Sequence, residues 1–379
     1  MSRVEDRIRG TGPKKILSLD GGGIRGMMTV EVLAALEDRL RKALGRGSDF
    51  VLADYFDFVA GTSTGAIIAT CVALGIPTSD IRDFYVTSGE AMFDKAFVLK
   101  RLRYKYEDEK LAGKLRQILG KDPAGKDIAL GSDRLRAVLM MVMRNATTDS
   151  PWPLSNNPWA KYNDRTRSDC NLDLPLWQLV RASTAAPVYF PPEVVTMGTH
   201  EFIFVDGGIT TYNNPAFQAF LMATLEPYRM NWPTGEDKLL VVSVGTGTSP
   251  QANENLDPSD MNLLYNAGSI PSALMFAALN EQDLLCRAFG KCLVGDALDR
   301  EIGDLIGAKG PVSPRLFTYL RYNAELTPQG LAALGLSDIK PENVQKLDSV
   351  KYIADLQRIG QAVVQKKVNL DHFAGFLKG

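Results

Sequence analysis

The 379-residue chain has few histidines and cysteines, the side chains on which many metal and redox sites depend. Only two histidines are present, His200 and His372, which excludes a metal site built from several histidines. The four cysteines form no CxxC pair, so we expect neither a zinc site nor a disulfide framework, and a reducing compartment is the simplest interpretation. Neither charge sign dominates, because 43 lysines and arginines face 44 aspartates and glutamates, and no general attraction to a nucleic acid polymer is expected.

Long apolar runs are absent as well. No window comes near about 18 uninterrupted apolar residues, so we expect no membrane-spanning helix. The N-terminal sequence MSRVEDRIRG mixes both charge signs without an apolar core, which is unlike a secretory signal. A cytoplasmic location follows as an expectation. With 45% hydrophobic and 23% charged residues, the composition is that of an ordinary globular protein with a sizeable core.

Two successive parts of the chain follow the same pattern of strand, glycine turn and helix. The turn DGGGIRG at residues 20–26 lies between an apolar strand at 16–20 and a helical pattern at 27–44. The turn GTSTG at residues 61–65 follows a second apolar strand at 56–60 and precedes another helix. This repetition predicts an α/β fold of three layers, with a central, mostly parallel sheet flanked by helices and the functional groups at the carboxyl ends of the strands.

The rest of the chain gives weaker patterns. Further strands are expected at residues 202–205 and 239–244, helices at 132–143, 177–184 and 272–289, and loops at 145–168 and 248–260. Beyond residue 310 the pattern is mostly helical. We therefore predict a catalytic domain over residues 14–310 and a C-terminal helical extension over residues 311–379, which is either an appended element or the outer layer of the same domain.

The glycine-rich turn at residues 20–26 supports two interpretations. It satisfies GxGxxG between a strand and a helix, the pattern of a dinucleotide-binding module. That module also needs an acidic residue at the end of a second strand about 20 residues further on, where this chain still has its helical pattern. The alternative is an oxyanion hole, because glycines let backbone N–H groups approach a ligand oxygen, the following helix adds a positive field, and Arg25 supplies a cation. A non-enzymatic nucleotide-binding module therefore stays open beside an enzyme.

The second glycine turn fits the G-x-S-x-G pattern of a nucleophilic serine. Gly61 and Gly65 would flank Ser63 on a tight turn that exposes its Oγ. A serine hydroxyl needs a base, and two candidates remain open on the residues alone. The order Ser63, Asp206, His372 is that of a Ser-His-Asp esterase. Alternatively Asp206, which ends a predicted strand before two glycines, acts directly as the base.

The motifs DGGGIRG, GTSTG and DGG (residues 206–208), in this order, resemble those of the patatin-like family of lipid acyl hydrolases, which use a Ser-Asp dyad. RASTAAPVYFPP at residues 181–192 and VGTG at 244–247 resemble further blocks of that family, so the likeness covers about residues 14–248. The family, rather than any spacing in the chain, implies hydrolysis of fatty-acyl esters of membrane phospholipids through an acyl-serine intermediate.

The resemblance also implies roles for single residues. Ser63 would be the nucleophile and Asp206 the general base. The N–H groups of Gly22, Gly23 and Ile24 would bind the oxyanion, with Arg25 in support. No metal and no cofactor is implied.

Partners are expected from two further stretches. Residues 84–106 mix aromatic and aliphatic side chains with lysine and arginine, which fits either contact with an anionic bilayer, here the inner membrane, or an ordinary solvated helix. EQDLLCR at 281–287 and YLRYNA at 319–324 are similar to segments of bacterial patatin-like effectors of antiphage signalling, in which a cyclic nucleotide from a partner synthase switches on phospholipid degradation. Arg287, Arg321 and Tyr322 are the candidate nucleotide contacts. A homo-oligomer is also compatible with the sequence.

Overall fold

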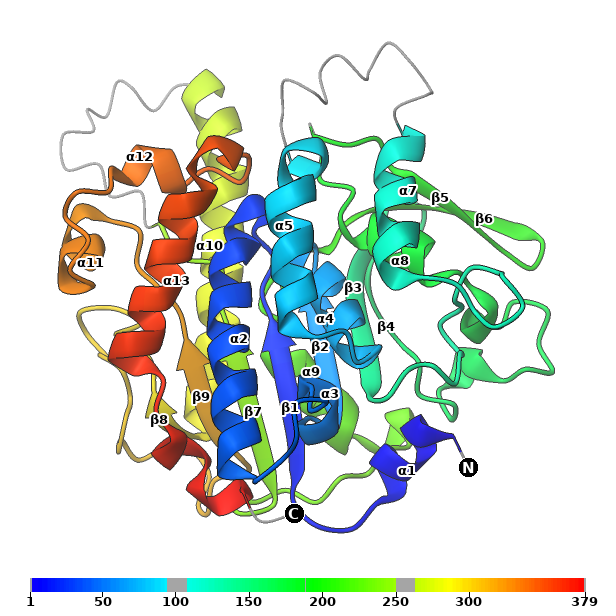
Figure 1. Ribbon diagram of the computed structural model, residues 1–379, viewed down its shortest axis with the longest axis horizontal. Helices are drawn as coiled ribbons and strands as arrows, with labels where there is room; N and C mark the ends of the chain where they lie inside the picture. Colours follow the sequence, from blue (N-terminus) through cyan, green and yellow to red (C-terminus); the bar gives the residue numbers. More distant parts are fainter. Residues whose placement is uncertain (1, 94–107, 188, 250–262, 378–379) are drawn as a thin grey trace.

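We describe a computed structural model of the chain, covering residues 2–93, 108–187, 189–249 and 263–377 (Figure 1). Within these residues, nine strands form one sheet in the order β5-β6-β3-β2-β1-β7-β9-β8, and β4 also pairs with β3. The strands are β1 (Lys14–Leu19), β2 (Phe58–Thr62), β3 (Val138–Asn145), β4 (Ser150–Ser155), β5 (Glu193–Met197), β6 (His200–Asp206), β7 (Leu239–Val244), β8 (Lys291–Val294) and β9 (Thr318–Tyr322).

Helices cover both faces of this sheet. In Figure 1, α2, α5 and α13 lie in front of the strands, and α9 and α10 lie behind them. The helices are α1 (Arg3–Arg9), α2 (Gly26–Ala43), α3 (Leu52–Tyr55), α4 (Thr64–Ala73), α5 (Thr78–Phe93), α7 (Asp108–Leu119), α8 (Leu176–Ser183), α9 (Ala216–Thr224), α10 (Leu263–Phe289), α11 (Pro328–Ala333), α12 (Pro341–Val344) and α13 (Ile353–Lys367). The predicted three-layer α/β fold with a C-terminal helical part is confirmed.

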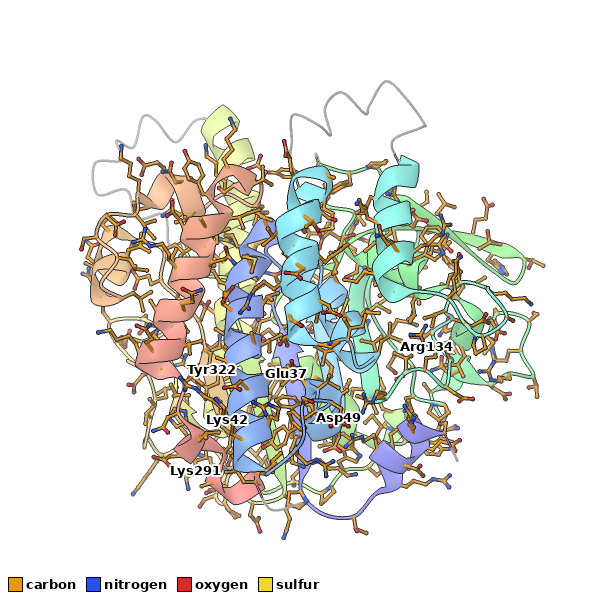
Figure 2. All side chains as sticks on the ribbon, in the orientation of Figure 1. Glu37, Lys42, Asp49, Arg134, Lys291 and Tyr322 are labelled. Carbon is orange, nitrogen blue, oxygen red and sulfur yellow. The ribbon has the colours of Figure 1, made fainter. Side chains whose placement is uncertain are left out.

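The centre of the sheet is parallel and buried on both faces. β1 pairs in parallel with β2 and β7, and all six residues of β7 are buried. A parallel strand covered by helices on both sides needs apolar side chains at successive positions, and LLVVSV in β7 supplies them. Glu37 on α2, labelled in Figure 2, accepts hydrogen bonds from the N–H groups of Leu52 and Thr78, and so joins α2 to the starts of α3 and α5.

Two strands meet end to end along one edge of β3. β2 pairs in parallel with β3 up to the pair Thr62 and Val142. β6 runs the opposite way and pairs with β3 from Asn145 down to the pair of Asp206 and Met143. Because β4 occupies the other edge of β3 from Met140 to Asn145, β2 and β6 must share one edge. The carboxyl ends of β2 and β6 therefore point at each other.

The secondary structure predicted for the residues of β3 and β4 is wrong. Residues 132–143 were expected as a helix, yet Val138–Asn145 forms β3, in which Val138 to Met143 are fully buried. A short apolar run buried on all sides has no polar face, so its periodicity does not separate a strand from a helix. The expected loop at 145–168 contains β4 despite two prolines. Pro151 and Pro153 are tolerated because they face Arg144 and Val142 on an edge strand, at the positions where the pairing with β3 needs no proline N–H.

The expectation of a mostly helical chain beyond residue 310 misses β9. This strand pairs in parallel with β7 and β8, and all five of its residues are buried. The sheet therefore includes residues on both sides of position 310, while the division into two domains stays a prediction. The helices expected at 177–184 and 272–289 are confirmed as α8 and α10.

No helix in the described ranges combines the length and the apolar character needed to cross a bilayer. The predicted membrane-contacting stretch at 84–106 is covered only in part. Its first residues belong to α5, which ends at Phe93, and Lys95, Lys100, Arg101, Arg103 and Lys105 lie outside the described residues.

Candidate active site

Ser63 lies on a sharp turn between β2 and α4. Its backbone has φ 54° and ψ −123°, a conformation that costs a residue with a Cβ roughly 1–3 kcal/mol. Both flanking glycines are required by space. A Cβ at Gly61 would lie 2.1 Å from the Gly65 carbonyl oxygen, and a Cβ at Gly65 would lie 2.2 Å from the Leu19 carbonyl oxygen. The turn has the tight geometry that G-x-S-x-G predicts.

The Ser63 hydroxyl is in direct contact with Asp206. Ser63 Oγ donates to Asp206 Oδ2 over 2.6 Å, and the other carboxylate oxygen accepts the Gly208 N–H over 2.7 Å. Ser63 immediately follows β2, and Asp206 is the last residue of the opposing strand β6. The contact therefore follows from the meeting of β2 and β6 on β3. The Gly208 hydrogen bond fixes the plane of the carboxylate against the serine.

Burial makes this carboxylate more basic than an exposed aspartate. Asp206 is only 5% exposed, and loss of water raises the pKa of its carboxyl from 3.8 to about 6. The hydrogen bonds from Ser63 and Gly208 act in the opposite direction and lower the pKa. The group is therefore still mostly ionised at neutral pH, and its pKa lies close to the value at which a general base works well.

The glycine turn of residues 20–26 lies beside this pair. Gly22 and Gly23 line the same cavity as Ser63, and within the described residues neither of their N–H groups donates to a backbone carbonyl. A Cβ at Gly22 would lie 2.1 Å from Thr246 Oγ1, so only glycine fits. These two N–H groups therefore stay available to a ligand oxygen, as the donors of an oxyanion hole must be.

Ile24 does not fit the predicted oxyanion hole. Its N–H donates to the Leu347 carbonyl over 3.0 Å, so it is already used by a residue more than 300 positions away. Arg25 lines the cavity, and its Nη1 donates to the Gln345 carbonyl over 3.2 Å. Burial lowers the pKa of the Arg25 guanidinium to about 10, which still leaves it charged at neutral pH.

A cavity of about 300 Å³ opens above Ser63 and Asp206. Apart from the glycine turn and the Ser63–Asp206 pair, its walls are mostly apolar. The apolar side chains come from α5, the segment after α8, the turn after β6, α10 and the segment after α12: Phe93, Ala186, Pro187, Phe190, Ile209, Met275 and Leu347. Such a site offers a polar end for an ester group and an apolar wall for the group attached to it.

Comparisons with known proteins show the family of this chain. The family model described as patatin-like phospholipase matches residues 17–220. The chain belongs to the patatin-like phospholipase family. Patatin-like protein 1 of Arabidopsis thaliana is 29% identical over 325 residues, which cover 74% of this chain and 75% of that protein. Patatin group J-1 of Solanum tuberosum is 29% identical over 256 residues, and the match spans only 61% of its length and 62% of this chain.

A solved structure shows a more distant likeness. VipD from Legionella pneumophila is 18% identical, with a TM-score of 0.36 over 94% of this chain and 68% of that chain. Membership of the patatin-like phospholipase family makes this chain a serine-dependent ester hydrolase that acts on lipid acyl groups.

Neither histidine reaches the patatin-like site. His200 is exposed at the turn between β5 and β6. His372 lies in a short helix, η8 (Leu370–Phe376), with its Nδ1 3.0 Å from the Tyr322 hydroxyl, and it lines a separate groove. Within the described residues, the cavity around Ser63 therefore contains no histidine. This geometry gives the alternative of a Ser-His-Asp esterase no support.

The predicted nucleotide contacts are buried in the interior. Arg287 and Arg321 are each 2% exposed, and Tyr322, labelled in Figure 2, is fully buried. Arg287 pairs with Asp283 over 2.7 Å, and Arg321 pairs with Asp20 over 2.6 Å. These ion pairs connect α10, β9 and the residue before the glycine turn. A bound nucleotide would therefore have to contact other residues.

Sequence reasoning missed two polar residues next to the pair. Ser183, the last residue of α8, accepts the Ser63 N–H on its Oγ over 3.0 Å. Asn213 lines the cavity, and its carbonyl accepts the Gly21 N–H over 3.0 Å. Ser183 lies in the RASTAAP block that carried the family resemblance, so the block was visible in the sequence but the contact was not.

Proposed function

We propose that this chain is a phospholipase of the A type, which cleaves fatty-acyl esters of membrane phospholipids with Ser63 as nucleophile and Asp206 as general base. The observation that carries the proposal is the 2.6 Å hydrogen bond from Ser63 Oγ to the buried Asp206 carboxylate at the polar end of an apolar cavity. No other base contacts the Ser63 hydroxyl within the described residues.

The first half of the reaction transfers the acyl group to the serine. Asp206 takes the Ser63 hydroxyl proton while Oγ attacks the ester carbonyl carbon. The negative charge that develops on the carbonyl oxygen is stabilised by the N–H groups of Gly22 and Gly23, with the Arg25 cation nearby. The C–O bond to the glycerol then breaks, the leaving alkoxide takes the proton from Asp206, and a lysophospholipid departs.

The second half regenerates the enzyme. A water molecule gives its proton to Asp206 and attacks the acyl carbon of the acyl-Ser63 ester. The same two N–H groups stabilise the second oxyanion. When this intermediate collapses, Asp206 returns the proton to Ser63 Oγ and a fatty acid is released. One carboxylate therefore serves both steps, which requires a pKa near the working pH.

The apolar cavity supports a lipid as the substrate. Phe190 and Met275 would contact the acyl chain, while Ile209 is 40% exposed at the cavity wall. An enzyme that takes an acyl chain from a bilayer must bind the bilayer surface at least briefly, so we place the working enzyme at the cytoplasmic face of the inner membrane. A binding role for the basic residues at 95–105 is part of this proposal.

Switching by a cyclic nucleotide in antiphage defence is the finer part of the proposal, and it rests on the likeness of residues 281–287 and 319–324 to such effectors. Because Arg287 and Arg321 are held in internal ion pairs, the nucleotide would bind elsewhere on the chain. Activation would then appear as faster lipid cleavage at unchanged enzyme concentration.

One assay tests both parts. Vesicles of phosphatidylethanolamine and phosphatidylglycerol are incubated with the protein, with and without a panel of cyclic dinucleotides and trinucleotides, and fatty acids and lysophospholipids are identified by mass spectrometry. We expect Ser63→Ala and Asp206→Asn to abolish release. Ser18→Ala is the matched control, because Ser18 is fully buried on β1 and its hydroxyl has no hydrogen-bond partner within the described residues.

Two results would contradict the proposal. Fatty acid release by folded Ser63→Ala protein would exclude Ser63 as the nucleophile. Equal release with and without every nucleotide would exclude the switching part while leaving the hydrolase intact.

A further inference from the structure

The junction of β2 and β6 on β3 contains a break in the hydrogen-bond ladder. The Val138 N–H donates to the Asp57 carbonyl, so the even-numbered residues of β3 face β2. If the parallel pairing continued past Thr62 and Val142, the Ser63 N–H would donate to the Val142 carbonyl. The positive φ of Ser63 turns the chain away from β3 at this point.

The hydroxyl of Ser183 occupies this break. Ser183 Oγ accepts the Ser63 N–H over 3.0 Å and donates its own proton to the Val142 carbonyl over 2.6 Å. A hydroxyl can do both at once, since it has one donor and two acceptor sites. Ser183 is fully buried, so no water competes for either bond. The donation to Val142 also fixes the direction of the hydroxyl and turns its lone pairs toward Ser63.

The same short segment holds the backbone of Asp206. The Asp206 N–H donates to the Ala185 carbonyl over 2.9 Å, two residues beyond Ser183. Residues 183–185 at the end of α8 therefore accept the N–H groups of both members of the pair. In addition to β3, on which β2 and β6 both end, this one segment therefore joins the Ser63 backbone to the Asp206 backbone.

We infer that Ser183 is a positioning residue for hydrolysis, which holds the strained Ser63 turn at the distance from Asp206 that proton transfer requires. This inference rests on the proposed function of Ser63 and Asp206. Ser183 does not line the cavity, so it acts through the Ser63 backbone and not on the substrate.

Loss of the hydroxyl has a specific kinetic consequence. In Ser183→Ala the Ser63 N–H and the buried Val142 carbonyl both lose their partner, and the turn relaxes away from Asp206. We expect kcat to fall about 10- to 100-fold, as for other small misplacements of reacting groups, with KM nearly unchanged because the cavity wall stays intact.

The pH profile separates positioning from simple destabilisation. The hydrogen bond from Ser63 lowers the pKa of Asp206, which burial raises. Weakening that bond in Ser183→Ala should therefore move the acid limb of kcat/KM to higher pH. A merely less stable protein with an intact pair would keep the acid limb of the wild type.

The test compares hydrolysis of 4-nitrophenyl butyrate by wild type, Ser183→Ala and a matched control across pH. The control is Thr70→Val, which removes another fully buried hydroxyl, one that donates to the Ala66 carbonyl within α4 and touches neither Ser63 nor Asp206. We expect Thr70→Val to keep the wild-type kcat and acid limb. If Ser183→Ala does not fold, Ser183→Cys, which keeps the shape of the side chain but is slightly larger and a weaker acceptor, is measured in its place.

Two outcomes are distinguishable. A wild-type kcat and acid limb in the Ser183 variant, with Ser63→Ala inactive, would overturn the positioning role and leave the proposed function standing. Activity in Ser63→Ala would instead overturn the proposed function itself.

Discussion

A carboxylate exposed to water is a weak base for a serine hydroxyl. The surroundings of Asp206 raise its pKa and so make it a stronger base. The pKa of Asp206 is raised to about 6, and the dominant cause is burial at the end of β6. A histidine base would have a similar pKa without burial. In the proposed mechanism a desolvated aspartate therefore does the work of an imidazole, and two hydrogen bonds favour its ionised form at neutral pH.

This basicity predicts the pH dependence of hydrolysis. Protonated Asp206 cannot accept the Ser63 proton, so kcat/KM should be level above about pH 6 and fall by about tenfold per pH unit below it. The measurement is kcat/KM for 4-nitrophenyl butyrate, whose ester does not titrate, with circular dichroism at each pH to show that the protein stays folded. A midpoint near the pKa of an exposed aspartate would mean that the carboxylate is solvated in the working enzyme.

At the same scale, the sequence predicted the residues that lie in local motifs, and the structure brings Ser63 and Asp206 into contact. Ser63 and Asp206 were predicted because each follows a strand and adjoins glycines. Ile24 was wrongly assigned, since the acceptor of its N–H is the distant Leu347. Arg321 was predicted as a nucleotide contact, but its side chain pairs with Asp20. The two residues are 301 positions apart, so the ion pair leaves no pattern in the sequence.

Among the elements, β9 shows how a late part of the chain supports the glycine turn. Arg321 on β9 makes two hydrogen bonds to the Asp20 carboxylate, of 2.9 and 2.6 Å, and Asp20 immediately precedes the turn. Burial raises the pKa of Asp20, and the Arg321 cation opposes that shift. The prediction of β3 as a helix and the omission of β9 have different causes. β3 is a nearly continuous apolar run, whose periodicity does not separate a strand from a helix. β9 contains Arg321, which is buried because it pairs with the distant Asp20, and that pairing is not visible in the local sequence.

Replacement of Arg321 should therefore be costly. In Arg321→Met the carboxylates of Asp20 and Asp283 lose a buried cation, and we expect the free energy of unfolding to fall by about 3–5 kcal/mol. Urea unfolding followed by circular dichroism measures the change. Arg358→Met is the matched control, because Arg358 pairs with Asp338 on the surface and its loss should leave the urea midpoint unchanged. Equal midpoints for the two variants would mean that the buried pair adds nothing.

On the scale of the whole molecule, the C-terminal part of the chain contributes to the wall of the cavity around Ser63. Leu347 lines the cavity, and its carbonyl accepts the Ile24 N–H. α13 lies against α2 so closely that a Cβ on Gly360 would come within 2.8 Å of the Met28 carbonyl oxygen. The motifs that identify the family all precede residue 248, so nothing in them could reveal that Leu347 lines the cavity.

These contacts predict that the chain cannot be divided at residue 310. A fragment of residues 1–310 would lack β9, and β8 would lose its only partner in the described sheet. We expect this fragment to be unfolded by circular dichroism and inactive toward 4-nitrophenyl butyrate, because the buried faces of β7 and α2 become exposed to water. Co-expression with residues 311–379 should restore some folded, active protein, since the missing strand and helices are then supplied separately. Folded and active 1–310 protein on its own would instead establish an independent catalytic domain, with β9 and α13 as additions to it.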